Sequence, residues 1–357
     1  MVYVSDLIKK ATDVSGLYYR SSFERGYLVN WDVQLAVWDR IFEDSVLNCQ
    51  PESSGILLTE PTFNFPEIRK NMDEIIFEEY GFKSLYRNNG SEIAAKSLNL
   101  SAFQNKRKTI PDCVMIVDIG QIDVGGLILT NFLKEMVSYR SWDMMDERYT
   151  INDVKEKCCY VTQDLSSDIK KAKFDFADIE SNYVLPDFTT TKTGFVLDKN
   201  KPSSNQNIDQ EQILSLKNER FLVPEILFSP SNAGMQSTLN ETYYINQGGL
   251  HEAILESINA CPQKMRGLLL KNIIVIGGTA KLSGLKERLE TELQSCVPSE
   301  YTVQIFIPED PSGYTWECGQ LLLENIHSGK YSEIMGPKIL SRKDYLEMGP
   351  DRVVNFF

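Results

Sequence analysis

The sequence is poor in histidine, with two among 357 residues, and its seven cysteines include no C-x-x-C pair. Two imidazole side chains supply few ligands for a zinc site and few candidates for the base of a Ser/His/Asp catalytic arrangement. An odd number of cysteines cannot all be paired, and the pattern fits a reducing compartment better than a disulfide-stapled secreted protein. We therefore expect no zinc site and no histidine-dependent hydrolase.

Long apolar runs and an excess of positive charge are also missing. No run of about 18 apolar residues is present, which is the length needed to cross a bilayer, and Met1 does not begin a signal-peptide pattern. The net charge is −13, so non-specific binding to nucleic acid through counterion release is not expected. These features predict a soluble intracellular protein with no membrane partner, and they favour basic protein surfaces as partners.

Buried strands alternate with helices along the chain. The pattern after Asn30 illustrates a helix, because Asn30 is a good N-cap and the apolar residues Trp31, Leu35, Trp38 and Phe42 then recur on one face. This alternation predicts an α/β architecture with largely parallel sheets. Strands are expected at 55–60, 112–120, 271–278 and 303–308. Helices are expected at 26–42, 65–82, 126–140, 151–164, 248–261 and 285–293, and a polar stretch covers 166–210.

Two glycine turns follow predicted strands. "KNIIVIGGTAKLSGLKERL" carries Gly277 and Gly278, and "QIDVGG" carries Gly125 and Gly126 a few residues after Asp118. Glycine lets a ligand approach the backbone, and a helix N-terminus offers free N–H donors to phosphate. A tight strand-to-helix connection explains each turn equally well, and both interpretations stay open on pattern alone.

Other polar groups have ordinary explanations. Lys155 in "DVKEK" fits either an adenosine site or a solvated helix face, and the second is the commoner case. The adjacent acids Asp146 and Glu147 are expected to be solvated rather than catalytic. Cys158 and Cys159 are expected to be buried apolar groups rather than nucleophiles.

A series of sequence blocks resembles the actin family, in order and over nearly the whole chain. They include "GYLVNWDVQLAVWDRIF", "DVKEKCCYVTQD", "NERFLVPEILFSPS", "KNIIVIGGTAKLSGLKERLETEL" and "LSRKDYLEMGP". The resemblance implies an actin-like ATPase-domain fold, in which two α/β domains with smaller subdomains surround a nucleotide cleft. It places a first large lobe at 1–122, a second at 123–310 with a small subdomain at about 155–220, and a return to the first lobe at 311–357.

The resemblance also implies the contacts of a bound nucleotide, which would be ATP or ADP with or without Mg²⁺. Lys155 and Glu156 match the family's contacts to the base and ribose. The remaining positions match the adenosine-side turn, the start of the second phosphate loop and the glycine turn beyond it, and they are Gly277, Gly278, Thr279, Asp118, Gly120, Asp123, Gly125 and Gly126.

The departures from the family pattern concern catalysis. No glycine-bearing phosphate loop precedes "VYVSDLIKK", and Gly120 runs straight into Gln121 where the family continues its second loop. We expect that the sequence as given lacks segments at its start and at the 120–121 junction. The glutamine that orients the attacking water in actin falls on Gly90, counted from Phe77, with Asn88 and Asn89 as possible substitutes. Because positioning supplies much of the rate of phosphoryl transfer, slow or absent hydrolysis is expected, with no catalytic residues.

Two further departures concern the base and the surface. Leu282 replaces the tyrosine that usually stacks on the base. The loop near 237–247 is longer than its actin counterpart, so we expect no self-polymerisation. Within it, Tyr243, Tyr244 and Ile245 are candidates to anchor a partner, because aromatic residues favour interface cores; a polar loop without a partner is the alternative.

Blocks such as "EPTFNF" and "MMDERYTIN" resemble a nuclear branch of the family, whose members are subunits of Swr-type chromatin remodellers. This implies a nuclear scaffold, with the cytoplasm as a second location. Its partners would be the remodeller motor subunit, a small subunit with a HIT-type zinc finger, and the nucleosome. The alternatives are a working ATPase or a cytoskeletal subunit that joins or caps filaments.

Overall fold

The computed structural model describes most of the chain and divides it into two compact units. The first unit comprises 1–11, 16–110 and 313–357, and the second comprises 12–15 and 111–312. The described residues are 3–10, 19–24, 26–98, 112–120, 125–174, 179–187, 191, 193–197, 212–233, 248–327, 339–354 and 356.

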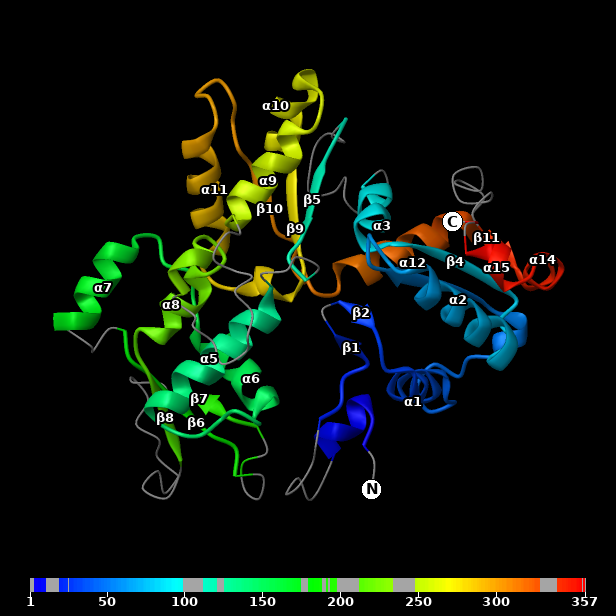
Figure 1. Ribbon diagram of the computed structural model, residues 1–357, viewed down its shortest axis with the longest axis horizontal. Coiled ribbons are helices and arrows are strands. Elements are labelled where there is room, and N and C mark those ends of the chain that lie inside the picture. The colour runs from blue at the N-terminus through cyan, green and yellow to red at the C-terminus, as the bar shows by residue number, and fades with distance from the viewer. Residues whose placement is uncertain are drawn as a thin grey trace. The chain divides into compact units, whose positions relative to one another are not determined.

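The first unit is built on a three-stranded sheet in the order β11–β4–β3. Strands β3 (Gly55–Glu60) and β4 (Ser84–Asn89) run parallel, with Gly55 opposite Ser84 and Glu60 opposite Asn89. Strand β11 (Ile339–Ser341) joins β4 in the antiparallel sense. A separate hairpin pairs β1 (Phe23–Glu24) with β2 (Tyr27–Leu28) (Figure 1).

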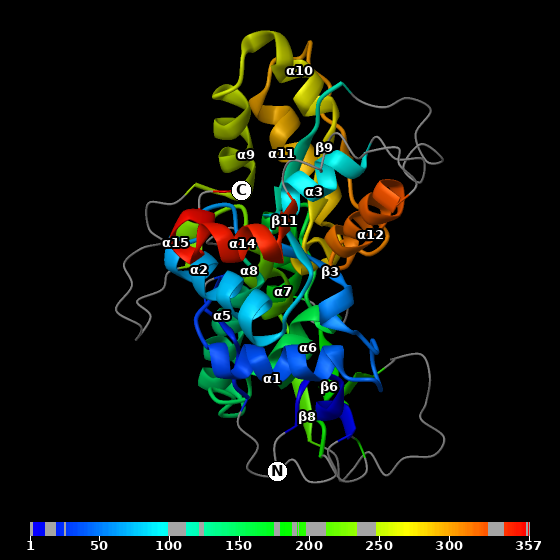
Figure 2. The same ribbon diagram turned by 90° about the vertical axis from the view of Figure 1, so that its right-hand side faces the viewer.

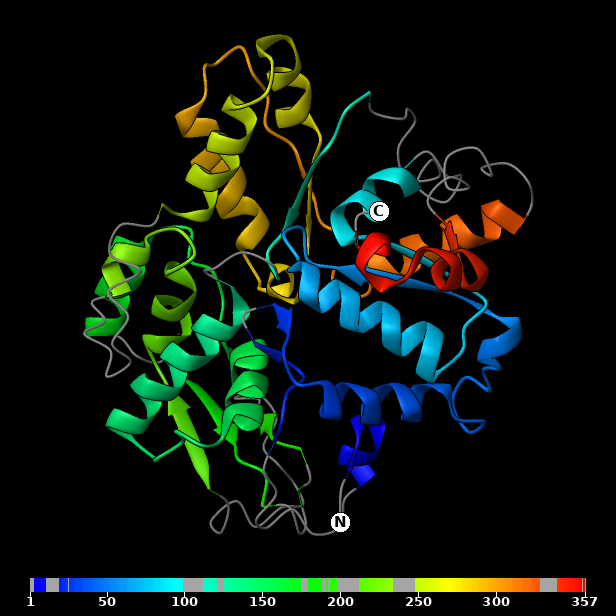
Figure 3. The ribbon, with the colours of Figure 1, turned by 45° about the vertical axis from the view of Figure 1, so that its right-hand side comes forward.

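Helices cover this sheet. Helix α3 lies along α12, and α15 lies against α2; Figure 2 shows α2, α14 and α15 as neighbours and Figure 3 gives an intermediate view of the same helices. The core contains Ile76, Phe77 and Leu85, each fully buried. The described helices and turns of this unit are η1 (Ser5–Lys10), α1 (Trp31–Phe42), η2 (Pro51–Ser53), α2 (Pro66–Glu74), the π-turn η3 (Ile75–Glu79), α3 (Gly90–Ser97), α12 (Tyr314–His327), α14 (Arg342–Met348) and α15 (Pro350–Val353).

The second unit has two sheets. Strands β5 (Met115–Asp118), β9 (Ile273–Ile276) and β10 (Ile305–Phe306) are parallel, with β9 in the centre, and β9 is buried at every position. Strands β6 (Ser181–Val184), β7 (Phe195–Val196) and β8 (Ile213–Leu216) form an antiparallel sheet. The described helices and turns are α5 (Gly126–Arg140), α6 (Arg148–Cys158), α7 (Leu165–Phe174), α8 (Glu219–Glu225), η5 (Pro230–Ala233), α9 (Leu250–Asn259), α10 (Gln263–Lys271), η7 (Gly278–Lys281) and α11 (Leu285–Cys296).

Most expected elements are present. Strand β3 has the predicted bounds, and helix α1 begins after Asn30, whose side chain accepts a hydrogen bond from the Val33 N–H. The helix expected over 65–82 is α-helical as far as Glu74 and continues as a π-turn. In the π-turn each backbone hydrogen bond spans five residues instead of four. The polar stretch 166–210 includes part of α7 together with β6 and β7. Strand β5, which lay within the expected first lobe, pairs with β9 in the second unit.

The structure describes all seven cysteines. All seven cysteines carry free thiols, and burial raises the pKa of Cys159 to about 12. Both Cys158 and Cys159 are buried in the core of the second unit, as expected for small apolar groups. Within the described ranges, no helix is long and apolar enough to cross a membrane, and no group of three or more His, Cys, Asp and Glu residues is arranged to hold a metal ion.

Candidate nucleotide site in the second unit

The two glycine turns lie at the same edge of the parallel sheet. Strands β5 and β9 are paired, with Asp118 opposite Ile276, so their carboxyl ends meet although about 160 residues separate them in the sequence. Polar residues that follow such strands gather at the ligand-binding edge of an open α/β sheet. A shared binding site therefore explains the two glycine turns better than two separate strand-to-helix connections do.

Gly277 lies close to the end of β5. Its φ is +98° and its ψ is 157°, a conformation that is essentially restricted to glycine. A Cβ at this position would lie 2.8 Å from the Gly120 nitrogen and 3.1 Å from an Asp118 oxygen. The backbone is held there by the Ile119 N–H, which donates to Ile276 O at 3.0 Å, and by the Gly277 N–H, which donates to Pro311 O at 2.8 Å.

The Gly125–Gly126 turn begins helix α5 and packs against the same region. Among the described residues, no side chain caps the helix start at Gly125, and the N–H groups at a helix start can donate to an anion. A Cβ on Gly126 would lie 2.8 Å from Thr279 Oγ1 and 3.5 Å from Lys155 Nζ. The turn, the residue after the double glycine and helix α6 therefore meet at one point.

Lys155 and Glu156 have different surroundings on α6. The Lys155 side chain is buried, and burial lowers the pKa of its ammonium group. It donates to Gly126 O at 2.9 Å, Thr130 Oγ1 at 2.8 Å and Asn152 Oδ1 at 2.8 Å. Glu156 is exposed, and its Oε1 accepts a hydrogen bond from Asn152 Nδ2 at 2.7 Å.

The opposite side of α6 is attached to the antiparallel sheet. The Tyr183 hydroxyl, which is buried on β6, donates to Asp153 Oδ2. Lys157 donates to Asp153 Oδ2 and to Gly194 O, both at 2.7 Å. Desolvation and the adjacent Asp153 carboxylate both raise the pKa of Tyr183. These contacts fix the direction in which α6 presents Glu156.

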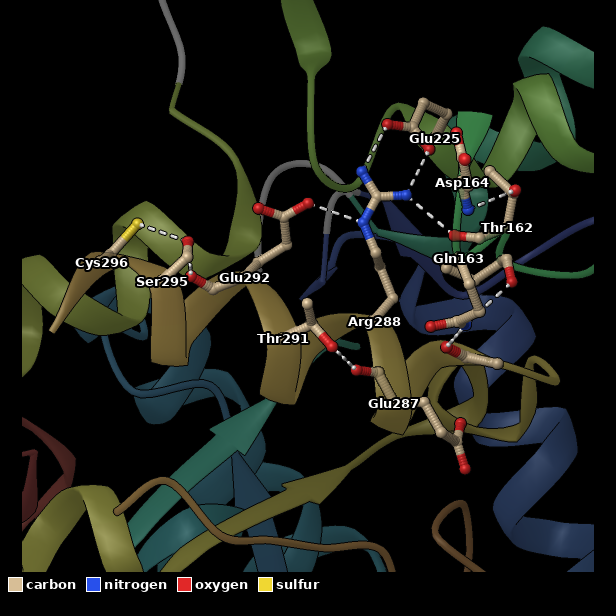
Figure 4. A network of polar contacts seen from close by, with 12 residues as sticks. Thr162, Gln163, Asp164, Glu225, Glu287, Arg288, Thr291, Glu292, Ser295 and Cys296 are labelled. Carbon is tan, nitrogen blue, oxygen red and sulfur yellow. Dashed lines mark hydrogen bonds and ion pairs between the residues drawn. The ribbon is translucent and has the colours of Figure 1, made fainter. Parts of the chain in front are cut away.

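A second polar network joins α11 to the segment after α6 (Figure 4). Arg288 donates to Glu225 Oε1 at 3.0 Å, to Glu292 Oε1 at 2.7 Å and to Thr162 O at 2.8 Å. Gln163 Nε2 donates to Gly284 O at 2.8 Å. Since Gly284 directly precedes α11, this network holds the helix that follows the double glycine.

The residues of this edge fit a nucleotide. Gly278 is exposed, and only Ser312 Oγ, at 3.7 Å, would meet a Cβ there, so a ligand can approach its backbone. Asp118 is half-buried and accepts a hydrogen bond from Gly120 N at 2.9 Å; burial raises its pKa and this bond opposes the rise. The arrangement offers N–H donors for phosphate at α5 and a carboxylate for ribose hydroxyls at Glu156.

Gly90 lies in the first unit, where it opens helix α3 after β4. A Cβ on Gly90 would lie 3.2 Å from Thr315 Cγ2. Asn89 caps α3, since its Oδ1 accepts from Glu92 N at 2.6 Å, and Asn88 Nδ2 donates to Tyr86 Oη at 2.8 Å. Both amide side chains that stood as possible substitutes for the catalytic glutamine therefore have internal hydrogen bonds.

The other predicted positions divide into three groups. Leu282 is buried in the core of the second unit. Asp146 and Glu147 are exposed, as expected for solvated acids. Asp123 and the loop residues Tyr243, Tyr244 and Ile245 lie outside the described residues, as does the chain directly after Gly120.

Sequence reasoning missed the polar residues that hold the site together. Thr130 and Asn152 bind Lys155, and Arg288 joins α11 to Thr162 after α6. Thr130 and Asn152 are each four or fewer residues from a predicted site residue on the same helix. Helical i, i+3 and i, i+4 spacing was therefore the available signal.

Comparison with known proteins identifies the family. The family model for actin matches residues 2–125 and 127–356. The chain is 36% identical over 371 residues to the actin-related protein 6 of Drosophila melanogaster, covering 97% of this chain and 88% of that protein. It is 39% identical over 334 residues to the actin-like protein ARP6 of Yarrowia lipolytica, covering 90% and 82%, and 35% identical over 356 residues to the actin-related protein 6 of Arabidopsis thaliana, covering 87% and 80%. The chain, with its mixed α/β units and paired glycine turns, belongs to the actin family.

Proposed function

We propose that this chain is a non-catalytic actin-fold scaffold subunit of a nuclear Swr-type chromatin-remodelling complex. In that role it supports histone-variant exchange into nucleosomes through contacts with other subunits and with the nucleosome. The proposal is supported by the similarity to proteins named actin-related protein 6 and by the sequence blocks shared with the nuclear branch of the family. The proposed partners are the motor subunit and a small subunit with a HIT-type zinc finger.

The observation that carries the absence of catalysis is Gly90. Glycine has no side chain to orient a water molecule, and the adjacent Asn88 and Asn89 are hydrogen-bonded within the first unit. Positioning and electrostatic stabilisation are the main contributions of a protein to phosphoryl transfer. A chain that binds a nucleotide without this positioning would keep it as a structural ligand.

The proposed nucleotide is ATP or ADP, with or without Mg²⁺. Gly277, Gly278 and Thr279 would face the adenosine, Glu156 would accept hydrogen bonds from ribose hydroxyls, and the N-terminus of α5 would donate to phosphate. When bound, the nucleotide supplies phosphate charge and hydrogen-bonding groups that the protein can use as a structural ligand. Such a ligand stabilises the folded state by mass action.

An affinity purification tests the scaffold role. The tagged full-length chain, recovered from nuclear extract and analysed by mass spectrometry, is expected to bring down the remodeller motor and the HIT-type subunit in stoichiometric amounts. Sedimentation of the purified protein at micromolar concentration with nucleotide and salt serves as the companion measurement, and no pellet is expected. Recovery of filament-capping proteins without remodeller subunits, or a pellet of self-assembled chain, would favour the cytoskeletal alternative.

A further inference from the structure

The Lys155 ammonium group is buried in the second unit, and no carboxylate among the described residues forms an ion pair with it. Lys155 is 6% exposed. The acceptors of its ammonium group are a backbone carbonyl, a hydroxyl and an amide oxygen. A lysine ammonium group has three N–H donors. Each of the three has an acceptor within the protein, at 2.8–2.9 Å, so no N–H remains for a nucleotide in this arrangement.

These acceptors connect two helices at the edge of the candidate site. Gly126 and Thr130 occupy the first two turns of α5, while Asn152 is on α6, one turn before Lys155. The Thr130 hydroxyl donates to Gly126 O at 2.9 Å, with Asn152 Oδ1 at 3.2 Å as the alternative acceptor. Asn152 also donates to Glu156. The network therefore reaches both the glycine turn and the exposed carboxylate.

The Gly125–Gly126 turn has little room to move toward Thr279. The position of a Cβ on Gly126 lies within 2.8 Å of Thr279 Oγ1, which is closer than real Cβ contacts. The carbonyl of Gly126 is the group that Lys155 binds. A shift of this carbonyl would move the turn that abuts Thr279.

We propose that Lys155 is a positioning residue of the nucleotide site and not a nucleotide ligand: its ammonium group ties the Gly125–Gly126 turn to α6 through Gly126, Thr130 and Asn152. The inference rests on the proposed nucleotide site and changes the role that the family resemblance implied for Lys155. Glu156 then provides the contact from α6 to the ligand. A preformed turn lowers the ordering cost of binding.

Three variants separate a positioning residue from a ligand. Lys155→Met removes the amine, Thr130→Val removes one of its acceptors and leaves the lysine in place, and Glu156→Gln alters the exposed neighbour as the matched control. Amide hydrogen exchange at residues 126–130 is measured on the nucleotide-free protein. The affinity for unmodified ADP is measured in parallel by calorimetry, because the label of fluorescent mant-ADP occupies a ribose hydroxyl that Glu156 would bind.

The positioning role predicts faster exchange at 126–130 in both Lys155→Met and Thr130→Val. Losing buried hydrogen bonds to a charged group predicts about a tenfold or larger increase for Lys155→Met. The ADP affinity falls in both variants, because the turn is no longer held, whereas Glu156→Gln weakens ADP binding without changing the exchange. A ligand role predicts that Thr130→Val leaves the affinity unchanged or raises it, since the amine is released.

Unchanged exchange in both Lys155→Met and Thr130→Val would overturn the inference. If Lys155→Met does not fold, Thr130→Val decides alone, because valine keeps the shape of threonine. A wild-type protein that binds no ADP would contradict the proposed nucleotide site, while the exchange measurement would still decide whether Lys155 holds the turn.

Discussion

Gly277→Ala is expected to abolish measurable nucleotide binding and to destabilise the second unit. The substitution forces an alanine into a φ of +98°, which costs about 1–3 kcal/mol. The new Cβ also meets the Gly120 nitrogen at 2.8 Å; this is a backbone atom that cannot rotate away, and overpacking adds about 1–3 kcal/mol. Since the displaced segment is the proposed adenosine-side turn, the mant-ADP affinity should fall by about 100-fold or more.

Gly349→Ala is the matched control for this prediction. Gly349 has nearly the same backbone conformation, with φ 78° and ψ 158°, and no atom of the described residues lies within 4 Å of its Cβ position. It should show the backbone cost alone and leave the mant-ADP affinity unchanged. Thermal unfolding and mant-ADP titration measure both effects, and equal behaviour of the two variants would contradict the close approach of Gly277 to Gly120.

Arg87→Met is expected to be the most destabilising substitution in the first unit. Arg87 is a buried residue of β4 that binds the buried carboxylate of Asp73, and its Nε lies 3.6 Å from Glu60 Oε2. Removing one partner of a buried ion pair leaves an uncompensated charge and typically costs about 3–5 kcal/mol. Denaturant unfolding at pH 7.5 measures this loss.

The loss should depend on pH because of Asp73. Burial raises the pKa of Asp73 to about 6, against the opposing attraction of Arg87. A folded-state pKa above the unfolded value means that the stability gained from the protonated form is present at low pH and is lost as the pH rises through about 6. Without Arg87 the pKa rises further, so at pH 5 Asp73 is neutral and Arg87→Met should cost less than about 1 kcal/mol, as for apolar replacement of a complete pair.

The double variant Arg87→Met/Asp73→Asn provides the control. Removing the carboxylate together with the arginine should recover most of the stability at pH 7.5 and remove the pH dependence of the effect. A destabilisation by Arg87→Met that is the same at pH 5 and pH 8 would show that the cost comes from packing and not from the unpaired Asp73 charge.

The Arg87 cluster also explains why strand β4 could not be predicted. Its sequence, "SLYRNN", places an arginine and two asparagines where a buried strand normally carries apolar residues. The strand is buried because Asp73 on α2 supplies the partner for Arg87, and this pairing joins residues 14 positions apart. By contrast, "GILLTE" has only one charged residue, and its apolar run predicted the bounds of β3 correctly.

In the candidate site, too, local sequence patterns were predictable and contacts between distant segments were not. Glycine turns after apolar strands were visible as a local pattern, and the family resemblance gave Lys155 and Glu156. The pattern did not contain the contact of Gly277 with Gly120 or that of Gly126 with Thr279, because strand pairing brings these segments together. Nor did it distinguish the buried Lys155 from the exposed Glu156, since the acceptors of Lys155 are spread over two helices.

The central claim is that this actin-family chain keeps a nucleotide-binding edge while lacking the side chain that positions water. Single-turnover release of phosphate from radiolabelled ATP, measured beside actin in the same buffer, tests it most directly. We expect a rate at least about 100-fold below that of actin, because a misplaced water alone costs about that factor. Turnover at a rate close to that of actin would contradict the claim.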